Sequence, residues 1–74
     1  MTLASVKPGQ TAVITSIESE DESAFRLAEL GLVPGREVSV IKTAPLGDPI
    51  AVKILNYELC LRRREAGSIM VEPV

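Results

Sequence analysis

One thiol and no imidazole limit the chemistry that this 74-residue chain can perform. Cys60 stands between Leu59 and Leu61, and the chain contains no histidine that could serve as its base. The serines and threonines are scattered without the pattern of a catalytic triad, and no glycine-rich P-loop is present to hold a nucleotide. We therefore expect a protein that binds a partner and is not an enzyme.

Carboxylates are concentrated between Glu18 and Glu22. Their oxygens could hold a hard or borderline cation. However, Ser19 followed three residues later by Glu22 is typical of a capping box, and acidic residues favour the positive end of a helix dipole. We favour the start of a helix. Because one cysteine and no histidine cannot build a transition-metal site, we predict no metal site and no cofactor.

Arg62, Arg63 and Arg64 form the only basic cluster. Neighbouring side chains at the end of a strand alternate between its faces, so the three arginines should not point one way. The net charge is −2, whereas a phosphate-binding protein needs a surplus of lysine and arginine. Contact with an acidic protein surface stays open, and nucleic acid is not the expected partner.

Length and composition predict one small domain, residues 1–74. Hydrophobic residues make up 46% of the chain, but Phe25 and Tyr57 are the only aromatics, so aliphatic side chains must build the core. A lone cysteine cannot form an internal disulfide, which favours a reducing cytoplasm. The first residues do not resemble a signal peptide, and no apolar run approaches the roughly 20 residues that span a bilayer. We expect no direct membrane insertion, so a membrane role would require another protein.

The first half of the chain predicts a strand and then a helix. A turn at residues 7–9 precedes residues 10–17, which are rich in β-branched side chains and so favour a strand. The helix is expected from about Glu20 to Leu30, ending at Gly31, where a positive φ is favourable. Residues 33–35 make a second turn.

The second half predicts four further strands whose apolar residues alternate. We place them at residues 37–43, 50–54, 58–62 and 68–72, with a tight turn at Asn56 and Tyr57 and a short 3₁₀ turn at 63–67. Inward positions are expected at Val38, Val40, Ile50, Val52, Ile54, Leu59, Leu61, Ile69 and Val71. Strands this short hide their edges best by closure, so we predict a mainly β fold, a small barrel of about five strands with one helix inserted between the first and second strands.

Three motifs along the chain resemble those of the FeoA family. They are residues 26–32 with the Pro-Gly pair at 34–35, then residues 44–50, then residues 61–66, and the middle motif is the most specific. The first motif also resembles the SH3-like C-terminal domain of iron- and manganese-responsive repressors. The resemblance to FeoA covers nearly the whole chain.

This resemblance implies an SH3-like barrel in the cytoplasm. It also implies assistance to FeoB, the membrane permease for ferrous iron, which carries an intracellular GTP-binding domain. It does not decide whether the chain activates, gates or stabilises that permease.

The helix supplies the first candidate partner-binding residues, which are Phe25, Leu27 and Leu30. A spacing of about 100° per residue spreads them over more than the one face that a small barrel can cover. In the interpretation we favour, the turn at Gly31 tucks Leu30 and Leu32 into the core. In the alternative, the apolar residues that remain exposed form a docking patch.

The segment between the second and third strands supplies the remaining candidates, which are Pro45, Leu46, Gly47, Asp48 and Pro49. Two prolines could simply make a rigid turn, with Leu46 folded over the end of the barrel. Alternatively, the rigid loop is preformed for recognition, which reduces the entropy lost on binding. The resemblance favours recognition.

Cys60 and Met70 should point away from their inward neighbours. Single apolar residues on a surface need no special explanation, and this is the reading we favour. The alternative is a partly apolar outer surface used for self-association, so a homo-oligomer stays open.

Two functions from different classes follow. The first is a non-catalytic accessory protein of bacterial ferrous iron uptake, which acts through protein–protein interaction with the FeoB-type permease. The second is a stand-alone SH3-like regulatory module related to the repressor domain, or a small RNA-binding barrel. A basic surface and stacking aromatics would favour the second function, and the chain has neither.

Overall fold

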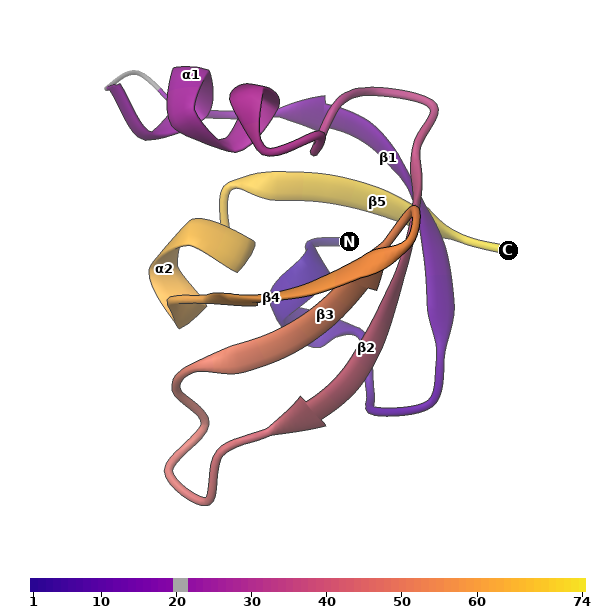
Figure 1. Ribbon diagram of the computed structural model, residues 1–74, viewed down its shortest axis with the longest axis vertical. Coiled ribbons are helices and arrows are strands. Elements are labelled where there is room, and N and C mark those ends of the chain that lie inside the picture. Colours follow the sequence, from indigo (N-terminus) through magenta and orange to yellow (C-terminus); the bar gives the residue numbers. More distant parts are fainter. Residues whose placement is uncertain (20–21) are drawn as a thin grey trace.

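The computed structural model describes residues 1–19 and 22–74. This part of the chain forms five strands, a longer helix beside them and a shorter helix after the fourth strand. Figure 1 shows their arrangement. The elements in order are η1 (Leu3–Ser5), β1 (Thr11–Ile17), α1 (Glu22–Glu29), β2 (Glu37–Thr43), β3 (Ile50–Ile54), β4 (Tyr57–Leu61), α2 (Arg63–Ala66) and β5 (Ile69–Pro73).

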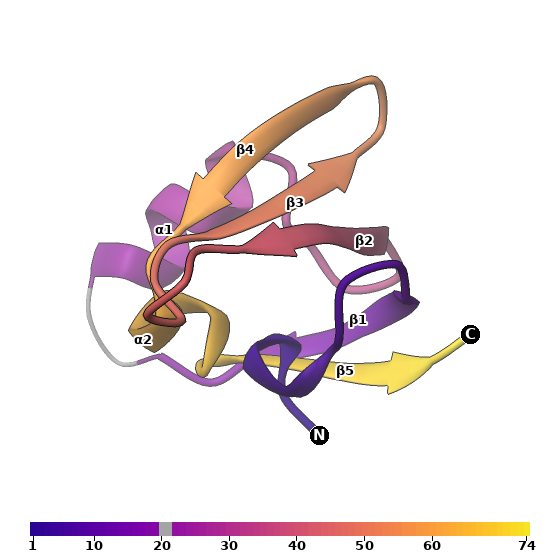
Figure 2. The ribbon, with the colours of Figure 1, turned by 90° about the horizontal axis from the view of Figure 1, so that it is seen from below.

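The strands form one antiparallel sheet in the order β4-β3-β2-β1-β5. Figure 2 shows them side by side in this order. The pairing of β1 with β5 is irregular between Ile14 and Ser16, and that of β2 with β3 between Val40 and Lys42. Such bulges increase local twist and bend a sheet, which helps so small a sheet wrap around its core. The predicted mainly β architecture, with a helix between the first two strands, is confirmed.

Aliphatic side chains fill the core, as the composition predicts. All the expected inward positions are buried except Leu59, which is half-buried and packs against the others. Tyr57 and Phe25 remain exposed, so the core described here contains no aromatic ring. The core comprises Leu3, Val6, Ala12, Ile14, Leu27, Leu32, Val38, Val40, Ile50, Val52, Ile54, Leu61, Ala66, Ile69 and Val71.

The N-terminal segment has a structural role that the sequence pattern did not indicate. Leu3 is buried within the 3₁₀ turn η1. Thr2 forms an isolated β-bridge with Met70, and the Val71 amide donates to the Met1 carbonyl at 2.9 Å. The segment therefore covers part of the outer edge of β5.

Three predicted boundaries need correction. The tight turn lies at Leu55 and Asn56, one residue earlier than expected, and Leu55 adopts a φ of 50°. Residues 63–66 form a short α-helix where a 3₁₀ turn was expected. Helix α1 ends at Glu29, so Leu30 lies in the turn that follows.

The C-terminal end of α1 is formed as the pattern predicts. Gly31 adopts a φ of 100°, the left-handed conformation that glycine takes without steric penalty. The predicted first helical residue, Glu20, and the acidic site that includes Asp21 lie outside the described residues. The capping role expected of Ser19 and Glu22 therefore stays a prediction.

Candidate functional site

The loop between β2 and β3 is a closed structure with an exposed tip. The Ala44 amide donates to the Pro49 carbonyl at 3.1 Å, and the Gly47 amide donates to the Ala44 carbonyl at 2.7 Å. Gly47 has a φ of 86°, and the Asp48–Pro49 peptide bond is cis. Leu46 at the tip is 96% exposed. The interpretation in which Leu46 folds over the barrel is therefore wrong, because this turn projects the side chain away from the protein.

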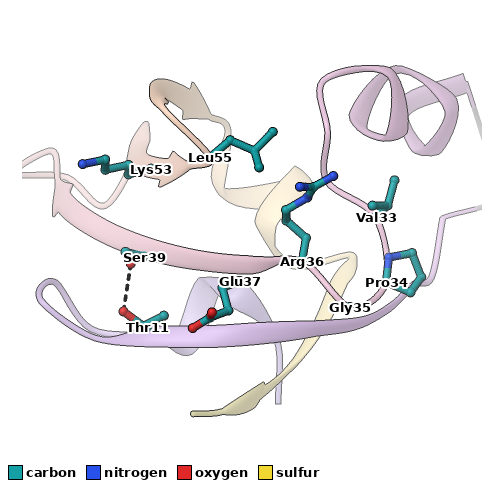
Figure 3. Close-up of a pocket in the computed structure, with 9 residues that line it drawn as sticks. All are labelled: Thr11, Val33, Pro34, Gly35, Arg36, Glu37, Ser39, Lys53 and Leu55. Carbon is teal, nitrogen blue, oxygen red and sulfur yellow. Dashed lines mark hydrogen bonds between the residues drawn. The ribbon is translucent and has the colours of Figure 1, made fainter.

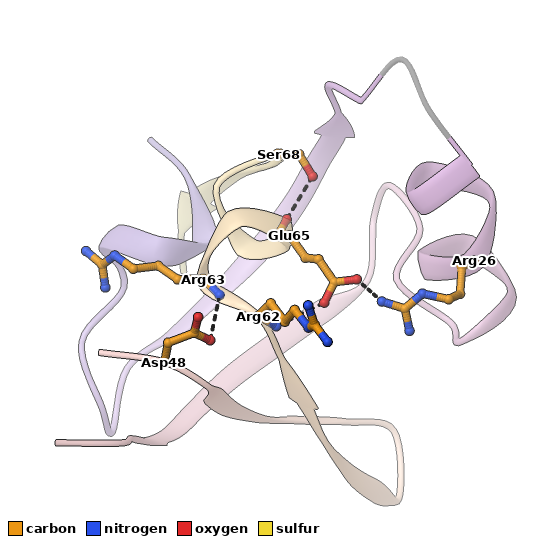
Figure 4. Close-up of polar contacts among 6 residues, drawn as sticks. All are labelled: Arg26, Asp48, Arg62, Arg63, Glu65 and Ser68. Carbon is orange, nitrogen blue, oxygen red and sulfur yellow. Dashed lines mark hydrogen bonds and ion pairs between the residues drawn. The ribbon is translucent and has the colours of Figure 1, made fainter. Parts of the chain in front are cut away.

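Asp48 joins this loop to helix α2. The Arg63 amide donates to Asp48 Oδ1 at 3.1 Å, so a carboxylate from the loop lies at the first turn of the short helix (Figure 4). The first amides of a helix have no partner within the helix, and a negative charge is favourable there. Asp48 thus satisfies a donor of α2 and holds the base of the loop in place.

Glu65 on α2 joins the helix to two other segments. Its carboxylate accepts the Arg62 amide at 2.9 Å and pairs with the Arg26 guanidinium of α1 (Figure 4). Its own backbone carbonyl accepts a hydrogen bond from the Ser68 hydroxyl. The carboxylate is only 8% exposed, and a buried carboxylate needs such partners because burial removes its water.

The three motifs of the sequence therefore meet at α2. Arg26 belongs to the first motif, Asp48 to the second, and Arg63 and Glu65 to the third. Spacing along the chain could not reveal this convergence, because it depends on how the elements pack. Helix α2, which follows β4, therefore contacts both α1 and the β2–β3 loop and fixes the positions of these two segments.

The candidate residues on α1 have different environments. Phe25 is 71% exposed, whereas Leu27 is 0% exposed and belongs to the core. Leu27 is therefore removed from the candidate docking surface, because it is the side chain by which α1 packs on the barrel. The favoured interpretation put Leu30 and Leu32 in the core: Leu32 is buried there, whereas Leu30 is half-buried and does not belong to the core.

Two side chains bond to the turn that follows α1. The Tyr57 hydroxyl donates to the Leu30 carbonyl, and Arg36 Nε donates to the Gly31 carbonyl at 3.2 Å. The last carbonyls of a helix lack intrahelical donors, and the Tyr57 hydroxyl supplies a donor at this end. The Gly31 carbonyl, just beyond the helix, also accepts the Val33 amide at 3.1 Å. The sequence pattern indicated a turn at Tyr57 and no role for Arg36.

The two exposed apolar tips lie far apart. Figure 1 shows α1, which carries Phe25, at the top of the molecule and the loop with Leu46 at the bottom. The candidates on the helix and those on the loop therefore do not form one continuous patch. A partner that contacts both must extend along the longest dimension of the domain, which is 28 Å.

An open groove of about 750 Å³ crosses the face of β1, β2 and β3 (Figure 3). It contains one acidic and two basic side chains, and a hydrogen bond of 2.8 Å joins Thr11 and Ser39 within it. No motif of the sequence pointed to this face. Its lining residues are Thr11, Val33, Pro34, Gly35, Arg36, Glu37, Ser39, Lys53 and Leu55.

Other predicted features lie on the surface. Arg62, Arg63 and Arg64 are exposed, Cys60 is exposed, and Met70 is half-buried. Within residues 1–19 and 22–74, no three His, Cys, Asp or Glu side chains gather as a metal site would require. None of the helices described is long and apolar enough to cross a bilayer.

Comparison with known proteins identifies the family of the chain. The FeoA domain family matches residues 1–73. A curated relative, the Fe(2+) transport protein A/Fe(2+) transporter FeoB fusion protein of Porphyromonas gingivalis (strain ATCC BAA-308 / W83), is 38% identical over 72 residues. This match covers 97% of the chain and 8% of the relative, so the chain spans only a small part of that protein's length.

Solved structures show the same fold. Iron(II) transport protein A from Clostridium thermocellum is 44% identical, with a TM-score of 0.94 over 100% of this chain and 46% of that one. FeoA from Stenotrophomonas maltophilia, solved in complex with zinc and described as a procaryotic SH3 domain protein, is 34% identical. Its TM-score is 0.87 over 97% of this chain and 89% of that one. The predicted SH3-like fold is confirmed.

A manganese-dependent transcriptional repressor shares the fold without close sequence similarity. It is 20% identical, with a TM-score of 0.92 over 100% of this chain and 36% of that one. Since identity is this low, the likeness concerns architecture alone.

Proposed function

The chain belongs to the FeoA family, whose members take part in ferrous iron transport, and we propose that it is a non-catalytic accessory protein that docks on the FeoB-type permease. The observation that carries the proposal is the relative in which an Fe(2+) transport protein A is fused to the transporter FeoB. Fusion keeps two polypeptides at high effective concentration, which benefits partners that act together. A cytoplasmic location and action without membrane insertion are parts of the same proposal.

The β2–β3 loop is the docking element that we assign first. Pro45, Leu46, Gly47, Asp48 and Pro49 are presented on a turn that two backbone hydrogen bonds and the Asp48–Arg63 contact hold in place. A loop that is ordered before binding loses less conformational entropy in the complex. Its exposed leucine provides apolar area that a partner can bury.

Phe25, with half-buried Leu30 near it in sequence, is the second docking element. Exposed aromatic side chains are frequent anchors in protein interfaces because they bury a large area with few rotatable bonds. This element lies at the other end of the domain, so it contacts a second surface of the permease.

The test is a titration of the isotope-labelled chain with the cytosolic domain of the cognate permease, followed by amide spectra. We expect shifts at residues 44–49 and around Phe25, and weaker binding for Leu46→Ala and Phe25→Ala. Leu55→Ala is the matched control, because Leu55 is also an exposed leucine in a turn between two strands. Equal affinity of the Leu46 and Phe25 variants and the parent chain would refute both assignments.

The regulatory alternative has support from fold only. A module of that kind would bind nucleic acid with an affinity that falls steeply as salt rises, because counterions are released on binding. A salt series with duplex DNA and with RNA separates the two functions. We expect no such binding from a chain of net charge −2.

A further inference from the structure

The two edge strands of the sheet, β5 and β4, differ in whether another part of the chain pairs with their outer side. At the β5 edge, the N-terminal segment supplies the Met1 carbonyl to Val71 and a bridge from Thr2, and Pro73 stands near the end of the strand. At the β4 edge, no backbone hydrogen bond in the described part of the chain joins Glu58 or Cys60 to anything beyond the sheet. One edge is therefore covered by the chain itself and the other is open.

The open groups on β4 can be assigned from its pairing with β3. Ile54 and Tyr57 close the two-residue turn, and the register continues without interruption to Ile50 and Leu61. Bonded pairs alternate with non-bonded pairs along an antiparallel ladder, and the pair that closes such a turn is bonded. Tyr57, Leu59 and Leu61 thus bond to β3, while Glu58 and Cys60 direct their N–H and C=O groups outward.

Strand β4 lacks several of the usual protections of an edge, and the one charged side chain that it carries is Glu58. Proteins commonly block such strands with proline, lysine or a bulge. The sequence Tyr-Glu-Leu-Cys-Leu contains no proline or lysine, and its register with β3 has no bulge. An unprotected edge is a template for another strand.

We propose that a second copy of this chain pairs with β4, antiparallel and about a two-fold axis at Leu59. Glu58 of each copy then faces Cys60 of the other, and the two residues exchange their outward N–H and C=O groups, which gives four hydrogen bonds. The half-buried Leu59 side chains meet at the axis. This self-association uses a surface separate from the loop and from Phe25, so it does not depend on the permease proposal.

Charge complementarity favours a second copy as the occupant. Arg62 retains an extended conformation, with φ −71° and ψ 147°, so Glu58, Cys60 and Arg62 share one face. In the two-fold arrangement the exposed carboxylate of Glu58 lies diagonally beside the exposed guanidinium of Arg62 from the other copy. The arrangement forms this pair twice and sets no like charges directly opposite each other, while the two Glu58 side chains are offset by two residues, as the two Cys60 side chains are.

Arg62 also fixes the register. Its amide already donates to Glu65 Oε1 at 2.9 Å, and its carbonyl accepts from Glu65 and Ala66. A register that set Glu58 against Arg62 would therefore form only the two bonds between the Cys60 residues. The register centred on Leu59 uses all the outward groups of Glu58 and Cys60.

Sedimentation equilibrium of the whole chain, up to about 1 mM, tests the pairing, because even a weak self-association is half formed there. We expect a monomer–dimer equilibrium that Cys60→Pro abolishes. Proline removes the outward N–H at this position and is tolerated on edge strands, and the amide spectrum of the variant would show that the fold is kept. A monomer at every concentration, or a dimer unaffected by Cys60→Pro, would overturn the proposal.

Exchanging the charges at positions 58 and 62 tests whether these two residues face each other across the dimer. Glu58→Arg alone and Arg62→Glu alone should each weaken the dimer by roughly fivefold or more, since each places like charges diagonally opposite twice. The double variant should recover the parent affinity. If the double variant associates no better than either single variant, these residues do not face each other and the two-fold arrangement is wrong.

The single thiol reports the register directly. An offset of two residues along neighbouring strands separates the two Cys60 Cα atoms by about 9 Å. This is beyond the range of a disulfide. We expect a short bismaleimide to cross-link the dimer and mild oxidation to leave it free. Efficient disulfide formation would contradict the register.

Discussion

Leu27 shows how much one side chain contributes to the attachment of α1. Among the described residues of that helix, it is the one that is buried. Leu27→Ala should lower the free energy of unfolding by about 2–5 kcal/mol, because it removes buried area and leaves a cavity. Phe25→Ala, on the same helix but exposed, should change it by less than about 0.5 kcal/mol. Urea denaturation of both variants measures the contrast, and similar losses would mean that Phe25 packs on the protein.

Glu65 and Arg26 form an ion pair whose two members differ in exposure. The carboxylate is buried and also accepts a backbone amide, whereas the Arg26 side chain is 55% exposed. Glu65→Gln should therefore destabilise the fold by about 1–3 kcal/mol, and Arg26→Ala by no more than about 1 kcal/mol. Thermal unfolding of the two variants tests this order. A larger loss of stability for Arg26→Ala would mean that the ion pair stabilises the fold more than the hydrogen bonding of the buried carboxylate does.

The β2–β3 loop and helix α2 behave as a joined pair of elements through Asp48. Asp48→Ala removes the acceptor of the Arg63 amide but leaves the bonds from Ala44 and Gly47 within the loop. We expect faster amide exchange at Arg63 and Gly47, with only a modest loss of global stability of about 1 kcal/mol.

Hydrogen exchange followed by amide spectra measures this effect residue by residue. Glu72→Ala is a suitable control, since Glu72 is an exposed carboxylate on β5 and should leave the exchange of the loop unchanged. Unaltered exchange at Arg63 in Asp48→Ala would show that the loop does not depend on this contact.

The strands could be predicted because alternation along the chain reports directly on which face is buried. Val38, Val40, Ile50, Val52 and Ile54 all point inward as the pattern required. The 3₁₀ turn at the N-terminus could not be predicted this way, because three residues are too short to show a period. Its contribution depends on packing against β5, which only the folded structure reveals.

The candidate docking residues were only partly separable from the core by sequence. Helical spacing spread Phe25, Leu27 and Leu30 over more than one face but did not show which of them the barrel covers, and the structure buries Leu27 and leaves Phe25 exposed. The direction of Leu46 could not be decided either, because two prolines are compatible with a turn that folds inward or outward. The contacts of Arg26 and Asp48 with α2 join residues far apart in the chain, and no local pattern encodes them.

At the scale of the whole molecule, the distance between the two apolar tips governs how they combine. Phe25 belongs to α1 and Leu46 to the β2–β3 loop, and these two elements lie at opposite ends of the molecule (Figure 1). Their effects on affinity for the permease should therefore add, so Phe25→Ala/Leu46→Ala should show the sum of the two single losses within about 0.5 kcal/mol.

Calorimetric titration of the permease domain with the parent, both single variants and the double variant measures the four affinities of this double-mutant cycle. A double loss clearly smaller than the sum would mean that the two tips act on one shared contact. A loss confined to one single variant would show that the permease reaches only that end.

The junction at α2 has a consequence for how the family can diverge. Arg26, Asp48 and Glu65 come from three separate stretches of sequence, yet all three contacts are made at the same short helix. Arg26 pairs with the Glu65 carboxylate, and Asp48 accepts the Arg63 amide. A lineage that replaces Arg26 leaves the buried Glu65 carboxylate without its cationic partner, so the two positions should be inherited as a pair and exchanged together. Asp48 is free of that constraint, because its partner is a backbone amide that almost any residue at position 63 supplies. Correlated substitution between positions 26 and 65, without the same correlation between 48 and 63, is the evolutionary signature that this geometry leaves.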